Sequence, residues 1–177
     1  MNIKATYFVL GTFLNEIREE IEKNGHCLAF HSYNHELENQ LAECRKVDYR
    51  IKGYRPPRSI ISPSLSDEHL STYNFEWLAS SSSSLDTRSP KIQNGIVKIP
   101  ILFDDFSLHE GKAKYEEWEK NAIDRIKQNY FVAFSLHDCY AHHWLPYYRE
   151  FLQKIRVLGK LKTLNEVASE IFLGSSK

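Results

Sequence analysis

The chain alternates between two hydrophobic patterns, and this alternation limits its fold more than any other feature. Short apolar runs rich in β-forming residues are separated by segments whose apolar residues recur at helical spacing. The clearest runs are residues 4–10, 27–30, 75–79, 96–102 and 130–136. Such alternation is typical of right-handed β-α-β units, so we predict an α/β fold with about six or seven strands in a parallel sheet or barrel.

Length and composition exclude several classes of protein. The 177 residues are enough for one domain with a substantial core, so we expect residues 1–177 to form a single domain. Apolar residues make up 42% and aromatic residues 13%, which excludes a disordered chain. The net charge of zero gives no electrostatic basis for binding nucleic acid. No apolar run approaches the ~20 residues that a membrane-spanning helix needs.

Cysteine usage and the N-terminal segment bear on the cellular compartment. The three cysteines, Cys27, Cys44 and Cys139, are odd in number and scattered, so they indicate neither a disulfide framework nor a thiolate zinc site. No basic segment followed by an apolar one marks a signal peptide. We therefore expect a cytoplasmic protein with reduced, mostly buried thiols.

Two histidines directly after an apolar run form a candidate metal site. His31 and His35 lie four residues apart, which places them on one face of a helical turn with Cβ atoms ~5–6 Å apart. In an extended strand they would be ~13 Å apart, so the chain must turn between them. This spacing suits two imidazoles on one divalent ion, with zinc the expected metal. The alternative is a pair of surface or capping histidines.

Other candidate residues follow two further strands. Arg55, Pro56 and Pro57 end the strand near residue 54, and His137 with Asp138 follows the run at 130–136. In parallel α/β folds functional residues gather at the carboxyl ends of strands. The sequence therefore predicts that these residues and the two histidines belong to one site.

Several motifs together, in this order, resemble a known family. They are Lys4-Ala5-Thr6-Tyr7-Phe8-Val9-Leu10-Gly11, Gly25-His26, His31-Ser32-x-x-His35, Gly53-Tyr54-Arg55-Pro56-Pro57 and Leu136-His137-Asp138. The chain is similar in these motifs to polysaccharide deacetylases of the NodB-homology type, carbohydrate esterase family 4. The resemblance implies a distorted (β/α) barrel of seven strands. It also implies metal-dependent removal of N- or O-acetyl groups from a glycan.

Roles for individual residues follow from the resemblance. It implies that His31 and His35 bind one divalent metal ion, usually zinc. Arg55 matches the arginine that orients the catalytic base, and His137 matches the histidine that protonates the leaving amine. A histidine suits that role because its unperturbed pKa of ~6.5 lies near neutral pH.

The expected partner is an acetylated polysaccharide or oligosaccharide. We expect Tyr54, Pro56, Asp138 and Trp144 to contact it, because they adjoin the matched motifs. For Trp144, core packing at the start of a helix is an equally good interpretation.

The chain departs from the family pattern at its beginning. The family opens with a strand carrying Thr-Phe-Asp-Asp-Gly, which supplies the catalytic base and the third metal ligand, and no such motif precedes Lys4. We therefore expect the first strand to be missing and activity to be reduced or absent. Asp104 and Asp105 resemble the motif in letters, but a strand-end turn with solvated aspartates explains them better. Asp86 is the nearest replacement for a family aspartate that tunes the catalytic histidine.

Two consequences of a missing strand remain open. The segment from Lys4 to Leu10 would expose an unpaired edge, through which a homodimer could form. A chain without the base could also be a non-catalytic carbohydrate-binding or scaffold protein that retains the deacetylase pocket. The sequence therefore supports two functions, a metal-dependent glycan deacetylase and a carbohydrate-binding relative of one.

Overall fold

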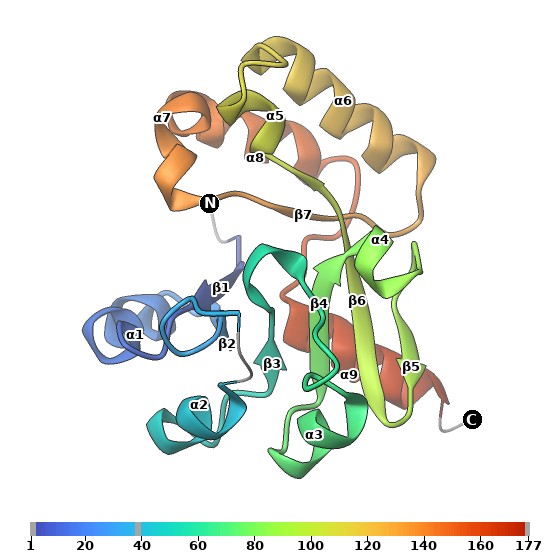
Figure 1. Ribbon diagram of the computed structural model, residues 1–177. Coiled ribbons are helices and arrows are strands. Elements are labelled where there is room, and N and C mark those ends of the chain that lie inside the picture. The colour runs from blue at the N-terminus through green and yellow to red at the C-terminus, as the bar shows by residue number, and fades with distance from the viewer. Residues whose placement is uncertain (1–2, 38–39, 176–177) are drawn as a thin grey trace. The chain divides into compact units, whose positions relative to one another are not determined.

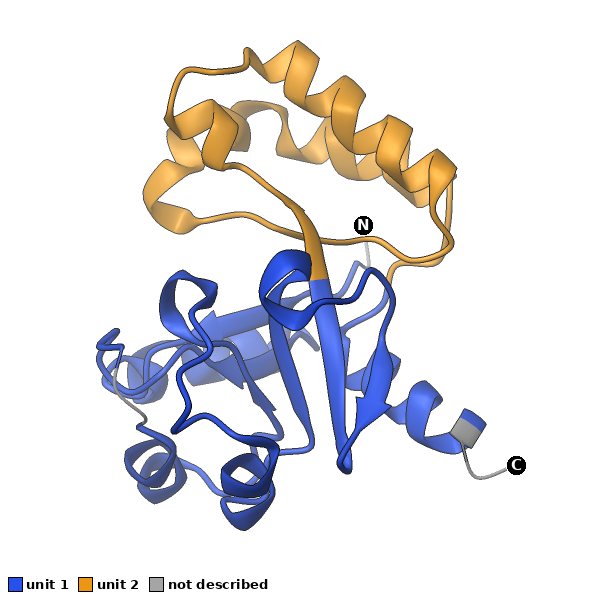
Figure 2. Cartoon of the chain, turned by 45° about the vertical axis from the view of Figure 1, so that its right-hand side comes forward, with its two compact units in different colours: residues 1–100, 162–177 blue, residues 101–161 orange. Residues whose placement is uncertain are grey.

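The computed structural model describes residues 3–37 and 40–175, and the chain divides into two compact units. Figure 2 shows unit 1 (residues 1–100 and 162–177) in blue and unit 2 (residues 101–161) in orange. The single domain over residues 1–177 stays a prediction, because compact units of this kind occur within domains as well as between them.

Unit 1 alternates strands and helices along the chain, as the sequence predicts (Figure 1). Its elements are β1 (Thr6–Val9), α1 (Leu14–Lys23), β2 (Cys27–Phe30), α2 (Leu41–Val47), β3 (Gly53–Tyr54), the 3-10 turn η1 (Pro57–Ser59), α3 (Asp67–Thr72), β4 (Trp77–Ser81), α4 (Ser82–Leu85), β5 (Lys91–Gln93), the first part of β6 (Ile96–Asp104) and α9 (Leu164–Ser175). The fold is therefore mixed α/β.

The strands form a seven-stranded sheet of order β1-β2-β3-β4-β6-β5, with β7 (Ala133–Ser135) paired to β6. β1 to β4 pair in parallel, whereas β5 and β6 form an antiparallel hairpin. Among the described residues the path runs from β1 at one end to β5 at the other, so closure into a barrel stays a prediction. The position of β1 at an end agrees with an edge strand, while a dimer through Lys4 to Leu10 also stays a prediction.

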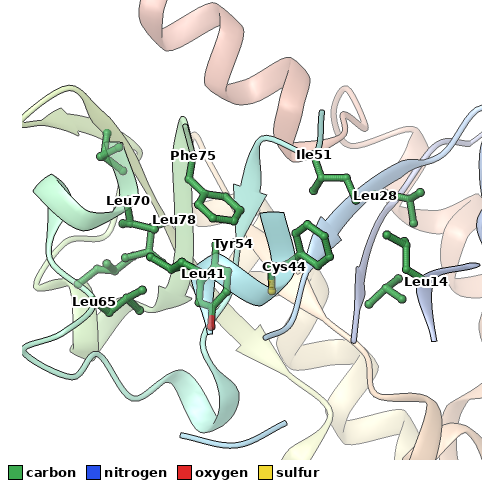
Figure 3. Close-up of a cluster of buried hydrophobic side chains, with 14 of the residues drawn as sticks. Leu14, Leu28, Leu41, Cys44, Ile51, Tyr54, Leu65, Leu70, Phe75 and Leu78 are labelled. Carbon is green, nitrogen blue, oxygen red and sulfur yellow. The ribbon is translucent and has the colours of Figure 1, made fainter. Parts of the chain in front are cut away.

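The core of unit 1 forms where helices cover the sheet (Figure 3). Leu14 of α1, Phe30 of β2 and Leu41 of α2 are fully buried, together with Leu70 of α3 and Leu78 of β4. Burying each such side chain contributes roughly 1.5–3 kcal/mol relative to leaving it exposed. These helices pack through one apolar face, as expected from their helical spacing.

Distant parts of the chain meet at α9, which belongs to unit 1 although 61 residues of unit 2 precede it. Thr6 Oγ1 in β1 accepts a hydrogen bond from the backbone N–H of Leu164, at 2.8 Å. The indole of Trp77 in β4 donates to Asn165 Oδ1 at 2.7 Å. These two bonds attach the start of α9 to two strands of the sheet.

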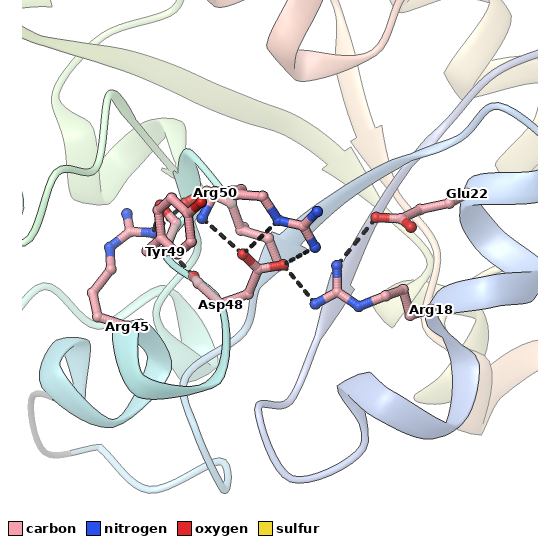
Figure 4. A network of polar contacts seen from close by, with 7 residues as sticks. Arg18, Glu22, Arg45, Asp48, Tyr49 and Arg50 are labelled. Atoms are coloured by element: carbon pink, nitrogen blue, oxygen red, sulfur yellow. Dashed lines mark hydrogen bonds and ion pairs between the residues drawn. The ribbon is translucent and has the colours of Figure 1, made fainter.

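A buried carboxylate joins α1 to the end of α2 (Figure 4). Asp48 accepts a bidentate pair of hydrogen bonds from the Arg50 guanidinium, at 3.1 and 3.0 Å, and contacts Arg18 at 2.6 Å. Burial by itself would raise the pKa of Asp48, but the hydrogen bonds from Arg50 and Arg18 lower this pKa to about 2. Asp48 is therefore ionised at every physiological pH.

Unit 2 is mostly helical. Its elements are the end of β6, α5 (Phe106–His109), α6 (Tyr115–Gln128), β7, the 3-10 turn η2 (Asp138–Tyr140), α7 (Ala141–Trp144), the 3-10 turn η3 (Leu145–Tyr147) and α8 (Tyr148–Arg156). Trp118 of α6 and Phe151 of α8 are each 1% exposed, and their ring centroids lie 5.2 Å apart. In the part of the chain that the structure describes, every helix is too short or too polar to cross a membrane.

Three segments differ from the simple strands that their composition indicates. In residues 4–10, Tyr7 of β1 is 43% exposed and packs edge-on against His26. Residues 130–136 form only the short strand β7, and Tyr130 before it is fully exposed. The serine run continues into the helical turn α4, since Ser81 Oγ accepts from the Ser84 N–H and caps it.

Candidate functional site

Unit 1 places His31 and His35 side by side in the two-histidine turn (residues 31–35), which follows β2. The ring centroids lie 5.1 Å apart, at an interplanar angle of 64°. The predicted helical turn is wrong, because the segment consists of bends in which Ser32 and His35 have φ values of 65° and 70°. These left-handed conformations, supported by a 2.9 Å bond from the His35 N–H to Ser32 Oγ, bring the rings together instead.

Gln40 fixes the middle of the two-histidine turn. Its side-chain oxygen accepts hydrogen bonds from the backbone N–H groups of Tyr33 and Asn34, at 2.8 and 3.0 Å. Gln40 is only 8% exposed, so these bonds are shielded from water. Sequence reasoning missed this residue because an amide seven residues from its partner carries no recognisable motif.

The imidazole of His31 is held in one orientation by the backbone of the arginine-proline segment. Its Nδ1 lies 2.9 Å from the carbonyl oxygen of Arg55. A carbonyl can only accept, so Nδ1 carries the proton and Nε2 keeps its lone pair in the neutral ring. Metal-binding histidines are oriented in this way by an outer hydrogen bond.

Arg55 is itself fixed at the end of β3. Its backbone N–H donates to the carbonyl of Phe30 at 2.8 Å, which ties it to the end of β2. The side chain is largely buried, and the guanidinium lies 5.4 Å from the centre of the Phe8 ring. The orienting role predicted for Arg55 remains a prediction.

The neighbouring predicted substrate contacts differ in accessibility. Tyr54 is 2% exposed and packs edge-on against Phe75 in the core, with ring centroids 5.5 Å apart. Burial raises the pKa of its hydroxyl. Pro56 is also buried and precedes the 3-10 turn η1. A substrate contact through the Tyr54 side chain therefore has no support from this placement.

The residues that could hold a metal in unit 1 make an incomplete site. Within residues 3–37 and 40–175, no group of three or more His, Cys, Asp or Glu side chains is arranged to bind a metal ion. Zinc takes three protein ligands in catalytic sites and four in structural ones. Burial raises the pKa of Cys44 to about 12, so that thiol stays protonated and is no substitute. Among the described residues the two histidines therefore supply only part of a zinc site.

Unit 2 contains a second oriented histidine. Asp105, fully buried just after β6, accepts from His137 Nδ1 at 2.5 Å and from the His137 backbone N–H at 2.8 Å. Its second oxygen also accepts from the Trp144 indole at 3.0 Å. A carboxylate in this position fixes the imidazole tautomer and stabilises positive charge on the ring. The His137 side chain remains 34% exposed, so its ring is open to solvent.

The contact between Asp105 and His137 corrects the sequence predictions for the aspartates. Asp104 is exposed, as expected of a strand-end turn, but Asp105 is buried and was wrongly expected to be solvated. The carboxylate that touches His137 is Asp105, whereas Asp86 caps α4 in unit 1. The contact follows from strand register, because β6 and β7 pair with Asp104 opposite Ser135, which places the residues after both strands together.

The two remaining predicted substrate contacts lie near His137 along the chain. Asp138 is exposed, and its Oδ1 accepts from the backbone N–H of Cys139 at 2.9 Å. Trp144 supports Asp105, and its ring packs edge-on against Tyr148 with centroids 5.2 Å apart. Trp144 thus helps to hold the Asp105 carboxylate in place. The sequence suggested sugar binding or core packing for Trp144 and did not suggest this contact.

No protein-family profile and no curated protein sequence matches this chain significantly. Solved structures do share its fold. The Bc1960 peptidoglycan N-acetylglucosamine deacetylase matches with a TM-score of 0.64 and 16% identity, over 93% of this chain and 75% of that one. The Xyl-CE4 domain of a multidomain xylanase from the hindgut metagenome of Trinervitermes trinervoides matches with a TM-score of 0.63 and 14% identity, over 96% and 78%.

A third solved structure places a limit on these comparisons. The 4-alpha-glucanotransferase of Thermococcus litoralis matches with a TM-score of 0.63 and 16% identity, over 96% of this chain. This chain spans about a third of that enzyme, 32% of its length. At such identities the likeness shows the fold alone. It supports the resemblance to carbohydrate esterase family 4 deacetylases at the level of fold.

Proposed function

We propose that this chain is a polysaccharide deacetylase-like protein that acts on N- or O-acetyl groups of a glycan. The observation that carries the proposal is the two-histidine turn, in which the His31 and His35 rings lie 5.1 Å apart and His31 Nδ1 is held by the Arg55 carbonyl. This is the arrangement of an imidazole prepared to ligate through Nε2. The fold shared with the Bc1960 peptidoglycan N-acetylglucosamine deacetylase and with the Xyl-CE4 domain supports the same class of function.

In this proposal His31 and His35 hold one divalent metal ion, with zinc favoured by two neutral imidazoles. His31 and His35 would hold the ion, and the chemistry that it would supply there is Lewis-acid activation of an acetyl carbonyl and of water. Because only two ligands come together among the described residues, we expect weak binding by this chain. The proposal therefore includes reduced activity.

His137 is the proposed proton donor. Cleavage of an amide requires a proton on the leaving nitrogen, because an amine anion is a very poor leaving group. With Nδ1 bonded to Asp105, the His137 ring delivers its proton from Nε2. The buried carboxylate then balances the positive charge that the ring carries before this transfer.

Metal binding and acetate release test the proposal together. We expect zinc bound by the purified chain to be lost in both His31→Ala and His35→Ala, and retained in the matched control His142→Ala, which removes an exposed histidine. Acetate release from acetylated chitooligosaccharides should fall in the same two variants. Equal zinc content before and after His31→Ala would contradict the proposal.

A second function is favoured by the incomplete ligand set. A carbohydrate-binding protein would bind the same oligosaccharides, measured by calorimetry, without releasing acetate. Binding without turnover, in a chain that holds zinc weakly or not at all, would favour this alternative. Turnover at ordinary enzyme rates, about 1–10³ per second, would exclude it.

A further inference from the structure

A buried lysine interrupts an apolar stretch of strand β6 in unit 1. Lys98 is 6% exposed and lies in β6 between Val97 and Ile99, both of which are fully buried. A buried ammonium is costly unless it is paired and hydrogen-bonded. Asp67, the first residue of α3, provides the partner through a salt bridge to Lys98 Nζ. The pair is therefore held by two elements of one unit.

The turn of the β5–β6 hairpin supports this pair. Asn94 and Gly95 both have positive φ values, 48° and 79°. Such values are required in the two-residue Asn-Gly turns that join the strands of a β-hairpin. The Asn94 side-chain amide donates to Asp67 Oδ2 at 3.0 Å. One carboxylate oxygen thus faces an ammonium and the other faces an amide.

These three side chains line a cavity of about 770 Å³. Its volume is within the ~300–1,000 Å³ range of small-molecule sites. The remaining wall is partly apolar, with Ile61, Leu65 and Leu85, and none of the residues assigned to the proposed metal or acid roles contributes to it. The cavity is therefore a separate feature of unit 1.

The chemistry of the wall selects a class of ligand. An ammonium carries three N–H donors. In the part of the chain that the structure describes, Asp67 is the one hydrogen-bond partner of the Lys98 ammonium. Two donors thus remain beside a carboxylate acceptor. A hydroxyl group can accept from Lys98 and donate to Asp67 at once, and aliphatic walls suit the C–H faces of a sugar ring.

The charges of the wall disfavour a ligand that carries only negative or only positive charge. Lys98 and Asp67 neutralise each other, and Glu68, an exposed residue, adds one negative charge to the cavity lining. An anion would meet the carboxylates of Asp67 and Glu68, whereas a cation would meet the ammonium. We propose that this cavity binds one neutral sugar residue through adjacent hydroxyl groups. Such a site goes beyond the proposed deacetylase function, because it requires neither metal nor hydrolysis.

Binding of glucose and N-acetylglucosamine to the whole chain tests this inference. Methyl NMR signals of Ile61, Leu65 and Leu85 should shift on titration, with a Kd on the order of millimolar. Lys98→Met keeps the length of the side chain but removes its donors, and should weaken binding at least about tenfold. Lys91→Met is the matched control, because Lys91 lies directly opposite Lys98 in the hairpin register and does not line the cavity.

A second variant covers the case in which Lys98→Met fails to fold. Ser84→Trp adds bulk at an exposed position of the cavity wall without touching the ion pair, and should also abolish the shifts. Unchanged binding in a folded Ser84→Trp or Lys98→Met variant overturns the inference. Tighter binding of glucuronic acid than of glucose would show that the cavity prefers an anionic sugar, which overturns the proposal of a neutral ligand.

The His31→Ala variant separates this inference from the proposed function. If the methyl shifts persist in His31→Ala while zinc binding is lost, the cavity is an independent sugar site. If wild-type protein neither binds zinc nor releases acetate but still shows the shifts, only the proposed function fails. If the shifts vanish in His31→Ala and persist in Lys98→Met, the sugar binds elsewhere and the cavity proposal is wrong.

Discussion

The two units each fix one imidazole at Nδ1, but they use acceptors of different charge. In unit 1 the acceptor for His31 is a neutral backbone carbonyl, that of Arg55. In unit 2 the acceptor for His137 is the fully buried carboxylate of Asp105. A carbonyl places the proton of the neutral ring on Nδ1, which suits a ligand that binds through Nε2, whereas a carboxylate balances a charged ring, which suits a proton donor. The same residue type is thus prepared for two different tasks.

His31 and His137 also differ in how far along the sequence the residues that support them lie. The two-histidine turn is held by Ser32 and Gln40, both within nine residues of His31. The Asp105 contact spans 32 residues and depends on the pairing of β6 with β7. Ser32 and Gln40 thus share the support of the turn, whereas Asp105 by itself accepts three hydrogen bonds, two from His137 and one from Trp144.

The largest effect is expected for Asp105→Ala. This change leaves three buried or half-buried donors, two from His137 and one from Trp144, without their acceptor. We expect the free energy of unfolding to fall by roughly 3 kcal/mol, measured by urea denaturation. Asp104→Ala, one residue earlier and exposed, is the control and should change little. Equal losses in the two variants would remove the distinction between the two histidine supports.

An intermediate effect on stability is expected when the Asp48 carboxylate is protonated. This carboxylate is buried in unit 1 and is paired with guanidinium groups instead of an imidazole. Its folded pKa of about 2 lies below the unfolded value of ~3.9. Its contribution is therefore present above pH ~4 and is lost as the pH falls through about 2, by roughly 1–3 kcal/mol.

The measurement is unfolding free energy against pH for wild type and Asp48→Asn. The wild-type curve should lose stability over this acid range, and the variant should start lower and show a smaller slope there. Parallel curves would show that Asp48 is not the group that titrates.

The smallest effect is expected for Gln40→Ala. Loss of its amide oxygen frees the backbone N–H groups of Tyr33 and Asn34, and should cost about 1 kcal/mol. Faster hydrogen exchange at these two amides, with weaker zinc binding, would show that Gln40 orders the two-histidine turn. Gln93→Ala, in strand β5, is the control. Unchanged exchange at Tyr33 would mean that the positive-φ residues suffice.

Local patterns of the sequence predicted what local interactions determine. The Asn24-Gly25 pair, typical of a helix end, does end α1, with Gly25 at a φ of 73°. The Thr-x-x-Glu pattern at residues 163–166 forms a capping box for α9, because the Thr163 N–H donates to Glu166 Oε2 at 2.7 Å and the Glu166 N–H donates to Thr163 Oγ1 at 3.3 Å. Such features depend on neighbours within four residues.

Contacts that depend on strand register could not be predicted in this way. Burial of Asp105 follows from the pairing of β6 with β7, which shifts register between Ile101 and Phe103. The two-histidine turn was predicted to bring its rings together, and it does, although through left-handed residues instead of a helix. More than one backbone conformation brings two residues four positions apart together. The sequence could therefore predict that the His31 and His35 rings lie close, but not the backbone conformation between them.

The placement of α9 has a consequence for biosynthesis. A ribosome adding about 5–20 residues per second produces β1 to β5 early, then the 61 residues of unit 2, and only afterwards the helix that bonds to Thr6 and Trp77. For roughly 3 to 12 seconds, while the 61 residues of unit 2 are being added, the nascent chain therefore holds an unfinished sheet that lacks α9. Unit 1 is completed only when Leu164 and Asn165 have left the exit tunnel.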